Sequence, residues 1–283
     1  MSGGPARPAA SPTAAGDGAR VGEPRAGAEG LIDSHCHLQS LAPDEREAAL
    51  DEARERGVRG FLVPATRLDE AEEILDLCRR HDDVWCALGV HPHDAESWRP
   101  GEGKRLAALL DHPSVLAVGE CGLDFYYDNA PRETQIAVFR RQLDIALEAG
   151  LPVVVHNRDS DAAMLEAVLR DEYAGLEADF HSFAGSLEMA RALIARGFYL
   201  GVTGMVTFKK ADNIREILAG IPDDRLLVET DTPYLAPVPY RGKPNRPGYV
   251  VEVAEKVAEL SGETVGLVAR RTSENFRRLF GPR

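Results

Sequence analysis

Short β-rich runs alternate with longer amphipathic stretches from residue 30 to the C-terminus, and this alternation restricts the chain to few folds. Runs such as Pro152–Val155 are apolar without a break, which is typical of strands covered on both faces in a parallel sheet. Eight such units in about 250 residues match a barrel of parallel strands that are each followed by a helix. The expected strands are Leu31–Asp33, Gly60–Pro64, Trp85–Leu88, Leu116–Gly119, Val153–Val155, Ala178–Phe180, Tyr199–Val202 and Leu227–Glu229.

Amphipathic helices are expected between these strands. The clearest spans Arg132–Ala149, where apolar residues recur at helical spacing and Gly150 can cap the C-terminus. Its expected buried stripe consists of Ile136, Phe139, Leu143, Ala146 and Leu147. The residues expected to face inward from the last helix are Leu267, Val268 and Phe276. The remaining expected helices are Asp44–Arg56, Leu68–Arg80, Asp161–Tyr173, Leu187–Arg196, Asn213–Ala219, Val250–Ser261 and Thr264–Phe280.

The turn after the first strand distinguishes between two α/β folds, the TIM barrel and the Rossmann fold. It reads His35-Cys36-His37, whereas a Rossmann fold needs a glycine-rich turn there. The sequence therefore predicts an α/β protein, a single (β/α)8 TIM barrel with a C-terminal helix, over residues 30–283. Residues 1–29 are rich in Gly, Ala, Pro and Ser and lack aromatic side chains, so we expect a disordered N-terminal tail.

The composition of the chain limits its expected binding partners and its expected location in the cell. The formal net charge of −13 weighs against a protein that coats nucleic acid, although it does not exclude an enzyme acting on nucleic acid. The sequence has neither a signal peptide's apolar core nor a run approaching the ~18 apolar residues of a membrane span. Its four cysteines lack CxxC spacing and are typical of reduced thiols. We expect a cytoplasmic monomer without a membrane partner.

Residues that can bind metal ions follow most of the expected strands, where barrels of this kind carry their chemistry. Six of the eight histidines fall at strand ends, and only His81 and His112 fall elsewhere. The segments at strand ends are Asp33–His37, Gly89–His93, Gly119–Glu120, His156, His181 and Glu229–Asp231.

The pair His35 and His37 follows the first strand. Because successive side chains alternate on an extended backbone, both imidazoles point to one side and can share one ion, while Cys36 points away. An isolated pair of this kind is more often hydrogen-bonded or on the surface. The metal-capable residues at other strand ends make ligation the favoured interpretation.

Glu120 lies between Gly119 and Gly122 at the end of the fourth strand. A surface ion pair is the commonest role of a glutamate. The two glycines, however, permit a close approach of the backbone, and a carboxylate can bridge two metal ions. We therefore expect Glu120 to be a metal ligand.

His156, His181 and Asp231 follow the fifth, sixth and eighth strands. Either histidine alone would more often be a hydrogen-bonded core residue, but together they can supply nitrogen ligands for a second ion. Asp231 can bind metal and accept a proton from bound water, or it can cap the turn that follows. We favour the catalytic role.

In combination these motifs resemble the TatD family of metal-dependent deoxyribonucleases, within the amidohydrolase-like barrel superfamily. The resemblance runs from about Leu31 to Phe280. The segments that carry it are Asp33-Ser-His-Cys-His-Leu38, Gly89-Val-His-Pro-His93, Gly119-Glu-Cys-Gly-Leu-Asp124, Val155-His156, His181-Ser-Phe183 and Glu229-Thr-Asp-Thr-Pro-Tyr-Leu235.

The resemblance implies two divalent metal ions and hydrolysis of DNA phosphodiester bonds, often from a 3′ end of single-stranded DNA. One ion would be bound by His35, His37 and Asp231, the other by His156 and His181. Glu120 would bridge them. The ions, Mg, Mn or Zn, would lower the pKa of a shared water, and Asp231 would accept its proton.

Other residues near the strand ends are candidates for substrate contacts. The side chains expected to bind phosphate are His93, Arg158, Lys209, Arg241 and Lys243. For His91 we expect a structural role. Tyr126 or Phe125 could stack on a base, and a core position is an equal alternative for Phe125.

Two other functions remain open at this point. A metallohydrolase of the same fold could cleave an ester, lactone, amide or aminoacyl link, because fold and metal ions do not fix the substrate. A non-catalytic barrel that binds a partner would be expected to have lost ligands, and all six are present.

Overall fold

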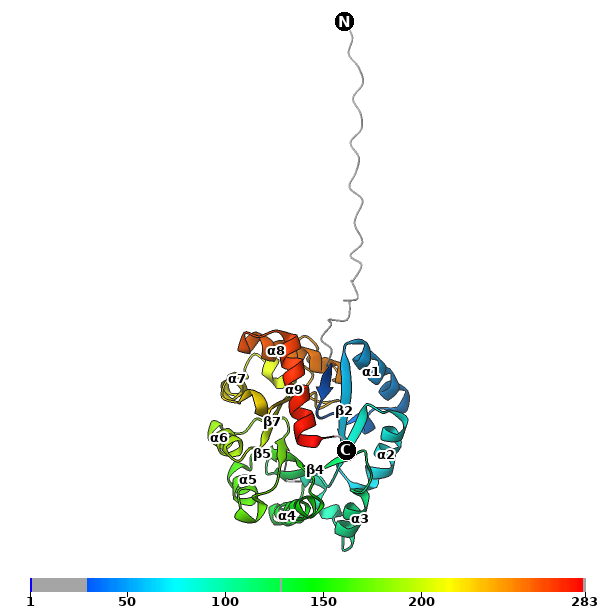
Figure 1. Ribbon diagram of the computed structural model, residues 1–283, viewed down its shortest axis with the longest axis vertical. Coiled ribbons are helices and arrows are strands. Elements are labelled where there is room, and N and C mark those ends of the chain that lie inside the picture. Colours follow the sequence, from blue (N-terminus) through cyan, green and yellow to red (C-terminus); the bar gives the residue numbers. More distant parts are fainter. Residues whose placement is uncertain (2–29, 128, 282–283) are drawn as a thin grey trace.

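The computed structural model describes residues 1, 30–127 and 129–281 and shows eight parallel strands arranged in sequence order (Figure 1). The barrel closes where the backbone N–H of His37 donates to the carbonyl of Thr232 and that of Asp231 donates to the carbonyl of His35. The predicted TIM barrel is confirmed. Its strands are β1 (Leu31–Asp33), β2 (Val58–Pro64), β3 (Val84–Leu88), β4 (Val115–Asp124), β5 (Val153–Arg158), β6 (Ala178–Phe180), β7 (Tyr199–Val202) and β8 (Leu226–Val228).

Helices surround the barrel, and every helix expected from the sequence is present. One helix, α3, was not expected. It is only 8 residues long, and Leu106 is the single buried residue of this fully described helix. The helices are α1 (Pro43–Glu55), α2 (Ala71–Arg80), α3 (Glu102–Leu109), α4 (Arg132–Ala149), α5 (Asp161–Val168), α6 (Leu187–Ala195), α7 (Asp212–Leu218), α8 (Val250–Ser261) and α9 (Val265–Phe280). The expected disordered tail, residues 1–29, lies outside the described residues apart from Met1.

One apolar cluster fills the inside of the barrel and a larger one lies between strands and helices. The inner cluster joins strand residues such as Ile32 and Leu62 to Phe276, Leu279 and Phe280 of α9. In Figure 1, α9 accordingly lies across the barrel. Since α9 covers one end, the carboxyl ends of the strands at the other end remain free for a site.

Two expected core positions are wrong. Leu147 of α4 and Leu267 of α9 are both exposed, whereas Val268 and Phe276 are buried as expected. Leu267 lies in the first turn of α9. Leu147 lies at the edge of the buried face of α4, which instead includes two hydrogen-bonded glutamines, Gln135 and Gln142.

Strand β4 continues to Asp124, beyond the expected end at Gly119. Its pairing with β5 is irregular between Val118 and Cys121, and within this interval the backbone N–H of Glu120 donates to the carbonyl of Ala65. The irregularity places the side chain of Glu120 in the buried mouth of the barrel.

All four cysteines are buried and have no disulfide partner, which agrees with the expected reduced thiols. Among the described residues, no helix combines the length and the apolar character that crossing a membrane requires.

Candidate metal centre

The six side chains predicted to bind metal converge at the mouth of the barrel. Convergence follows from the fold, because the carboxyl ends of parallel strands meet at one end of the barrel. All six are buried or half-buried. They are His35 and His37 after β1, Glu120 of β4, His156 of β5, His181 after β6 and Asp231 after β8.

His35, His37 and Asp231 form a first group. The Nε2 atoms of the two histidines lie 3.2 Å apart. Oδ1 of Asp231 lies 3.9 Å from Nε2 of His35 and 3.5 Å from Nε2 of His37. The two rings meet edge to face at 77°, so their Nε2 atoms converge on one position.

His156 and His181 belong to a second group, which also contains His91. Nδ1 of His156 lies 3.2 Å from Nε2 of His181. His91, for which we expected a structural role, brings its Nε2 to 3.4 Å from Oε1 of Glu120. In the sequence, its position was indicated by the segment Gly89–His93 that follows β3.

Glu120 lies between the two groups and offers one oxygen to each. Oε2 is 3.3 Å from Nε2 of His35 and 3.4 Å from Nε2 of His37. Oε1 is 3.0 Å from Nδ1 of His156 and 2.8 Å from Nε2 of His181. This is the arrangement that a bridging carboxylate requires.

The spacing of these atoms fits bound divalent cations. Two ligand atoms at about 2.1 Å from one ion lie about 3.0 to 3.4 Å apart in octahedral or tetrahedral geometry. Most of the separations within the two groups fall in or near that range. Imidazole nitrogens and carboxylate oxygens are also ligands that Zn and Mn accept.

The electrostatics favour neutral imidazoles at His35 and His91 and a charged carboxylate at Glu120. Burial lowers the pKa of His35 to about 3 and that of His91 to about 4, so both rings are neutral at pH 7. Burial alone would raise the pKa of Glu120, but the surrounding histidines outweigh it and lower that pKa well below its usual range.

His156 differs from His35 and His91. Burial lowers its pKa, but hydrogen bonds to Asp124 and Glu120 outweigh burial and raise the pKa of His156 to about 9. A cation that takes Nδ1 of His156 as a ligand must therefore displace a proton at pH 7.

Asp124 is a functional candidate that sequence reasoning missed. Its Oδ2 lies 2.8 Å from Nε2 of His93 and 3.3 Å from Nε2 of His156. Its Oδ1 accepts hydrogen bonds from the backbone N–H groups of Tyr126 and Tyr127. A carboxylate placed behind a histidine ligand fixes the orientation of the ring. Asp124 is the last residue of the motif Gly119–Asp124, but the sequence did not indicate where its side chain points.

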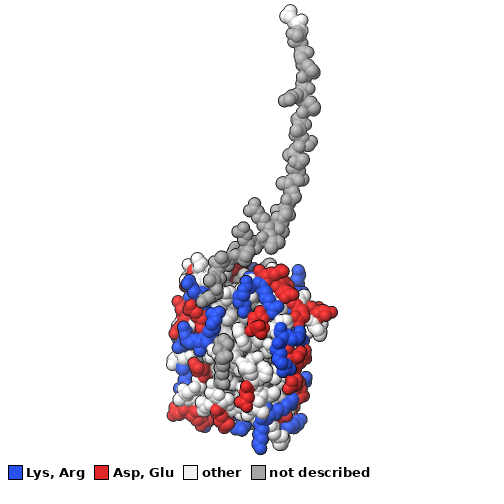
Figure 2. Space-filling model, turned by 45° about the vertical axis from the view of Figure 1, so that its right-hand side comes forward, with Lys and Arg blue, Asp and Glu red and all other residues white. Residues whose placement is uncertain are grey.

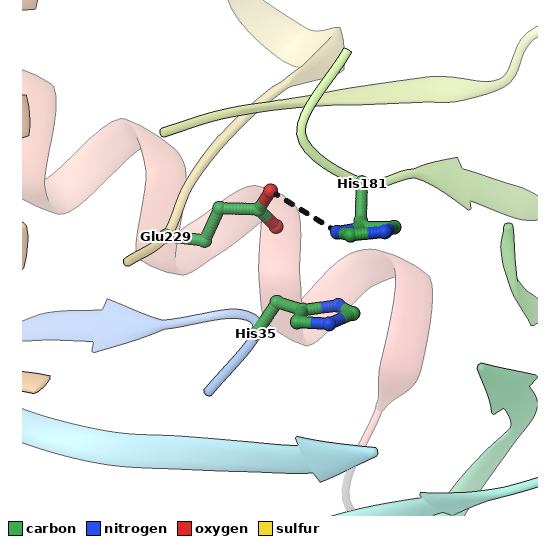
Figure 3. A group of neighbouring side chains, drawn as sticks. All are labelled: His35, His181 and Glu229. Atoms are coloured by element: carbon green, nitrogen blue, oxygen red, sulfur yellow. Dashed lines mark ion pairs between the residues drawn. The ribbon is translucent and has the colours of Figure 1, made fainter. Parts of the chain in front are cut away.

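Glu229 lies inside the barrel next to His35 and His181 (Figure 3). The two imidazoles stack 3.9 Å apart, and Nδ1 of His181 lies 3.8 Å from Oε1 of Glu229. The same oxygen accepts from the backbone N–H of Ser182, while Oγ of Ser34 lies 3.4 Å from Oε2. A fully buried carboxyl group thus lies beside two of the candidate ligands, a position that the sequence did not reveal.

A cavity of about 1190 Å³ opens over the centre. Of the five side chains predicted to bind substrate, His93 and Arg158 line it. Lys209, Arg241 and Lys243 lie outside the lining that the described residues form, and the Arg241 guanidinium rests 3.6 Å from the centroid of the Phe208 ring. Figure 2 shows basic and acidic side chains interspersed over the face in view.

A TIM barrel with histidines and carboxylates gathered at the carboxyl ends of its strands has the architecture of a metal-dependent hydrolase. The chain belongs to the TatD family, because the family model described as TatD related DNase matches residues 32–281. The resemblance found in the sequence is thereby confirmed, and the protein is a metal-dependent hydrolase of that family.

Three known proteins illustrate the relationship. YabD of Bacillus subtilis, described as an uncharacterised metal-dependent hydrolase, is 37% identical over 251 residues, which are 88% of this chain and 98% of YabD. TatD of Salmonella typhimurium, described as a 3′-5′ ssDNA/RNA exonuclease, is 37% identical over 243 residues, 83% of this chain and 93% of its own. The solved structure of YJJV, a TatD homologue from Escherichia coli, matches with a TM-score of 0.83 and 31% identity, covering 88% and 97% of the two chains.

Proposed function

We propose that this protein is a deoxyribonuclease that hydrolyses phosphodiester bonds at the 3′ end of single-stranded DNA with two divalent metal ions. The observation that carries the proposal is the position of Glu120, whose two carboxylate oxygens each contact a separate group of ligands. Two ions held a few ångströms apart suit phosphoryl transfer, because they can stabilise charge on both the attacking and the leaving oxygen.

In this proposal His35, His37 and Asp231 hold one ion, His156 and His181 hold the other, and Glu120 bridges them. His91 adds a further nitrogen donor to the second group. The bound ions supply Lewis-acid activation of water and phosphate. Asp231, whose pKa lies below its usual value because its histidine neighbours outweigh burial, is charged at pH 7 and can accept the proton of the attacking water.

Cationic and hydrogen-bonding side chains would orient the substrate phosphates. Arg158 and His93 line the cavity and would contact phosphates close to the reacting one. Lys209, Arg241 and Lys243 follow β7 and β8 at the same end of the barrel, outside the cavity lining. They would contact more distant nucleotides of the strand.

Two of the finer assignments draw on relatives. The 3′-5′ direction and the single-stranded substrate come from the name of the Salmonella typhimurium relative. The ligand set suits Zn or Mn, while phosphoryl transfer is commonly supported by Mg, so all three ions belong to the proposal. A monomer in the cytoplasm, as expected from the sequence, completes it.

Digestion of end-labelled DNA tests the proposal. Metal-stripped protein is incubated with a single-stranded oligonucleotide carrying a 5′ or a 3′ label, and Mg, Mn or Zn is added back singly. A 3′-5′ exonuclease produces a ladder from the 5′-labelled strand and an immediate labelled mononucleotide from the 3′-labelled strand. Glu120→Gln serves as the matched control and should leave both strands intact.

Intact DNA with every ion, from folded protein that still binds metal, would contradict the nuclease. The search would then move to carboxylic esters, lactones, amides and aminoacyl links, which the same metal centre could hydrolyse.

A further inference from the structure

Three tyrosines at the mouth of the barrel are unusually exposed. Among the described residues, the aromatic side chains that are more than half exposed are Tyr126 at 57%, Tyr127 at 53% and Tyr234 at 59%. Tyr127 and Tyr234 line the cavity over the metal centre. Phe125, the other base-stacking candidate, is instead half-buried against the core. Large rings left in water at a substrate cavity indicate a surface that a ligand covers.

The backbone that carries these rings is fixed by the metal centre itself. The N–H groups of Tyr126 and Tyr127 donate to Oδ1 of Asp124 at 2.9 and 3.0 Å, while Oδ2 of Asp124 contacts His93 and His156. These contacts fix the backbone from which both rings project, which lowers the entropy lost when a ligand stacks on them.

Tyr234 is also anchored through its backbone, on the opposite side of the centre. Its N–H donates to the carbonyl of Asp231 at 2.8 Å, and its carbonyl accepts from the side chain of Asn245. Its ring centroid lies 6.3 Å from that of His37.

Arg158 joins Tyr126 and Tyr127 in one surface. Its guanidinium lies 4.3 Å from the Tyr126 ring centroid and 5.0 Å from the Tyr127 ring centroid. We call Tyr126, Tyr127 and Arg158 the aromatic platform. A guanidinium beside aromatic rings combines positive charge for phosphate with flat faces for a base.

The topology places the aromatic platform and Tyr234 across the mouth from each other. The platform follows β4 and β5, whereas Tyr234 follows β8 and packs near His37 after β1. In a barrel of eight strands in sequence order, the β4–β5 and β8–β1 positions are opposite. A strand that crosses the metal centre would therefore meet one aromatic surface on each side.

We infer that the aromatic platform and Tyr234 bind the two unpaired nucleobases that flank the scissile phosphate, and that this stacking selects single-stranded ends. The inference rests on the proposed nuclease function and adds its base-binding residues. Bases inside a duplex are stacked and paired, so a ring within the cavity can reach a base face only after unstacking. Unpaired bases of any sequence offer that face, which makes the contact sequence-tolerant.

The inference is tested by a double-mutant cycle in which a tyrosine ring, a nucleobase or both are removed. Wild type, Tyr234→Ala and Tyr127→Ala are assayed on a single-stranded oligonucleotide and on the same strand with abasic tetrahydrofuran residues at its 3′ end. Loss of one stacked base corresponds to about 5- to 150-fold in KM. Each alanine variant should raise KM on the normal strand by about that factor. Removing the ring and the base together should raise KM by far less than the product of the two separate factors.

Phenylalanine variants separate stacking from hydrogen bonding by the phenol. Tyr234→Phe and Tyr127→Phe retain the ring and should stay within about threefold of wild type on the normal strand. Losses in the phenylalanine variants equal to those in the alanine variants would overturn stacking. Stacking would also be overturned if the effects of ring removal and base removal on KM multiply independently.

The assay also separates this inference from the proposed function. Wild type that cleaves normal and abasic strands with equal KM contradicts base stacking and leaves the nuclease intact. Wild type that cleaves neither strand contradicts the nuclease and the stacking together.

Discussion

Gly201 of β7 lies against the carboxylate of Glu229 so closely that an added Cβ would come within 2.7 Å of Oε2. Glu229 in turn contacts the backbone of Ser182 and faces Nδ1 of His181. The missing side chain at position 201 therefore leaves the space in which a buried carboxyl group lies beside a candidate metal ligand.

We predict that Gly201→Ala displaces Glu229 and with it the imidazole of His181. Overpacking of this kind costs about 1 to 3 kcal/mol of stability, and disturbing the support of a ligand costs about 10- to 100-fold in metal affinity. Thermal unfolding and calorimetric titration with Mn or Zn measure the two effects.

Gly266→Ala provides the matched control, because nothing lies within 4 Å of a Cβ added there. It should leave metal affinity unchanged. A Gly201→Ala protein that binds metal as tightly as wild type would show that Glu229 does not support the centre.

Glu120→Gln is expected to remove activity while preserving the fold. The amide has the volume of the carboxylate but cannot bridge two cations as an anion, so turnover should fall by at least about a hundredfold. The melting temperature of the metal-free protein should move by less than about 5 °C. Near-normal turnover in the folded variant would refute the bridging role.

Asp124→Asn should change how metal affinity depends on pH. Because the pKa of His156 is raised to about 9, the ring carries a proton at pH 7 that an entering cation displaces. The affinity of the wild type should therefore rise by up to about tenfold per pH unit and level off near pH 9. Without the negative charge of Asp124, the pKa of His156 falls and the rise ends at lower pH.

Calorimetric titrations at pH 6.5, 7.5 and 8.5 compare the two proteins directly. The wild-type slope should exceed that of Asp124→Asn over the upper pH unit. Identical slopes would mean that the Asp124 carboxylate does not hold the proton on His156.

Arg158→Ala should weaken single-stranded DNA binding more than Lys243→Ala, because only Arg158 lines the cavity. A lost phosphate contact reduces the slope of log affinity against log salt by about 0.7 for single strands. Fluorescence anisotropy over a salt series measures this slope. Equal slopes for Arg158→Ala and wild type would place Arg158 away from phosphate.

The fold could be predicted from the sequence because the strands are short apolar runs and most helices carry a periodic apolar pattern. The stretch Arg132–Ala149 became a helix with the expected bounds. Helix α3 could not be predicted, since it is short and buries only Leu106 along its fully described length. Leu147 and Leu267 were misplaced because helical spacing gives the direction of a stripe but not its edge.

The ligand candidates could be predicted because their residue types recur at one end of a parallel barrel. Where each side chain points was beyond the sequence. His91 and Asp124 acquire their positions from contacts across different strands, and Glu229 depends on the space left by Gly201. The cationic side chains of loops were the least predictable, as Lys243 shows, because loop paths have no periodic signal.

Crystals of the protein soaked in Mn and measured at the Mn absorption edge test the central claim most directly. The account predicts two anomalous peaks at the barrel mouth, one against Oε2 of Glu120 beside His35 and His37, the other against Oε1 beside His156. A single peak, or peaks that do not contact Glu120, would contradict a centre in which this carboxylate bridges two metal ions.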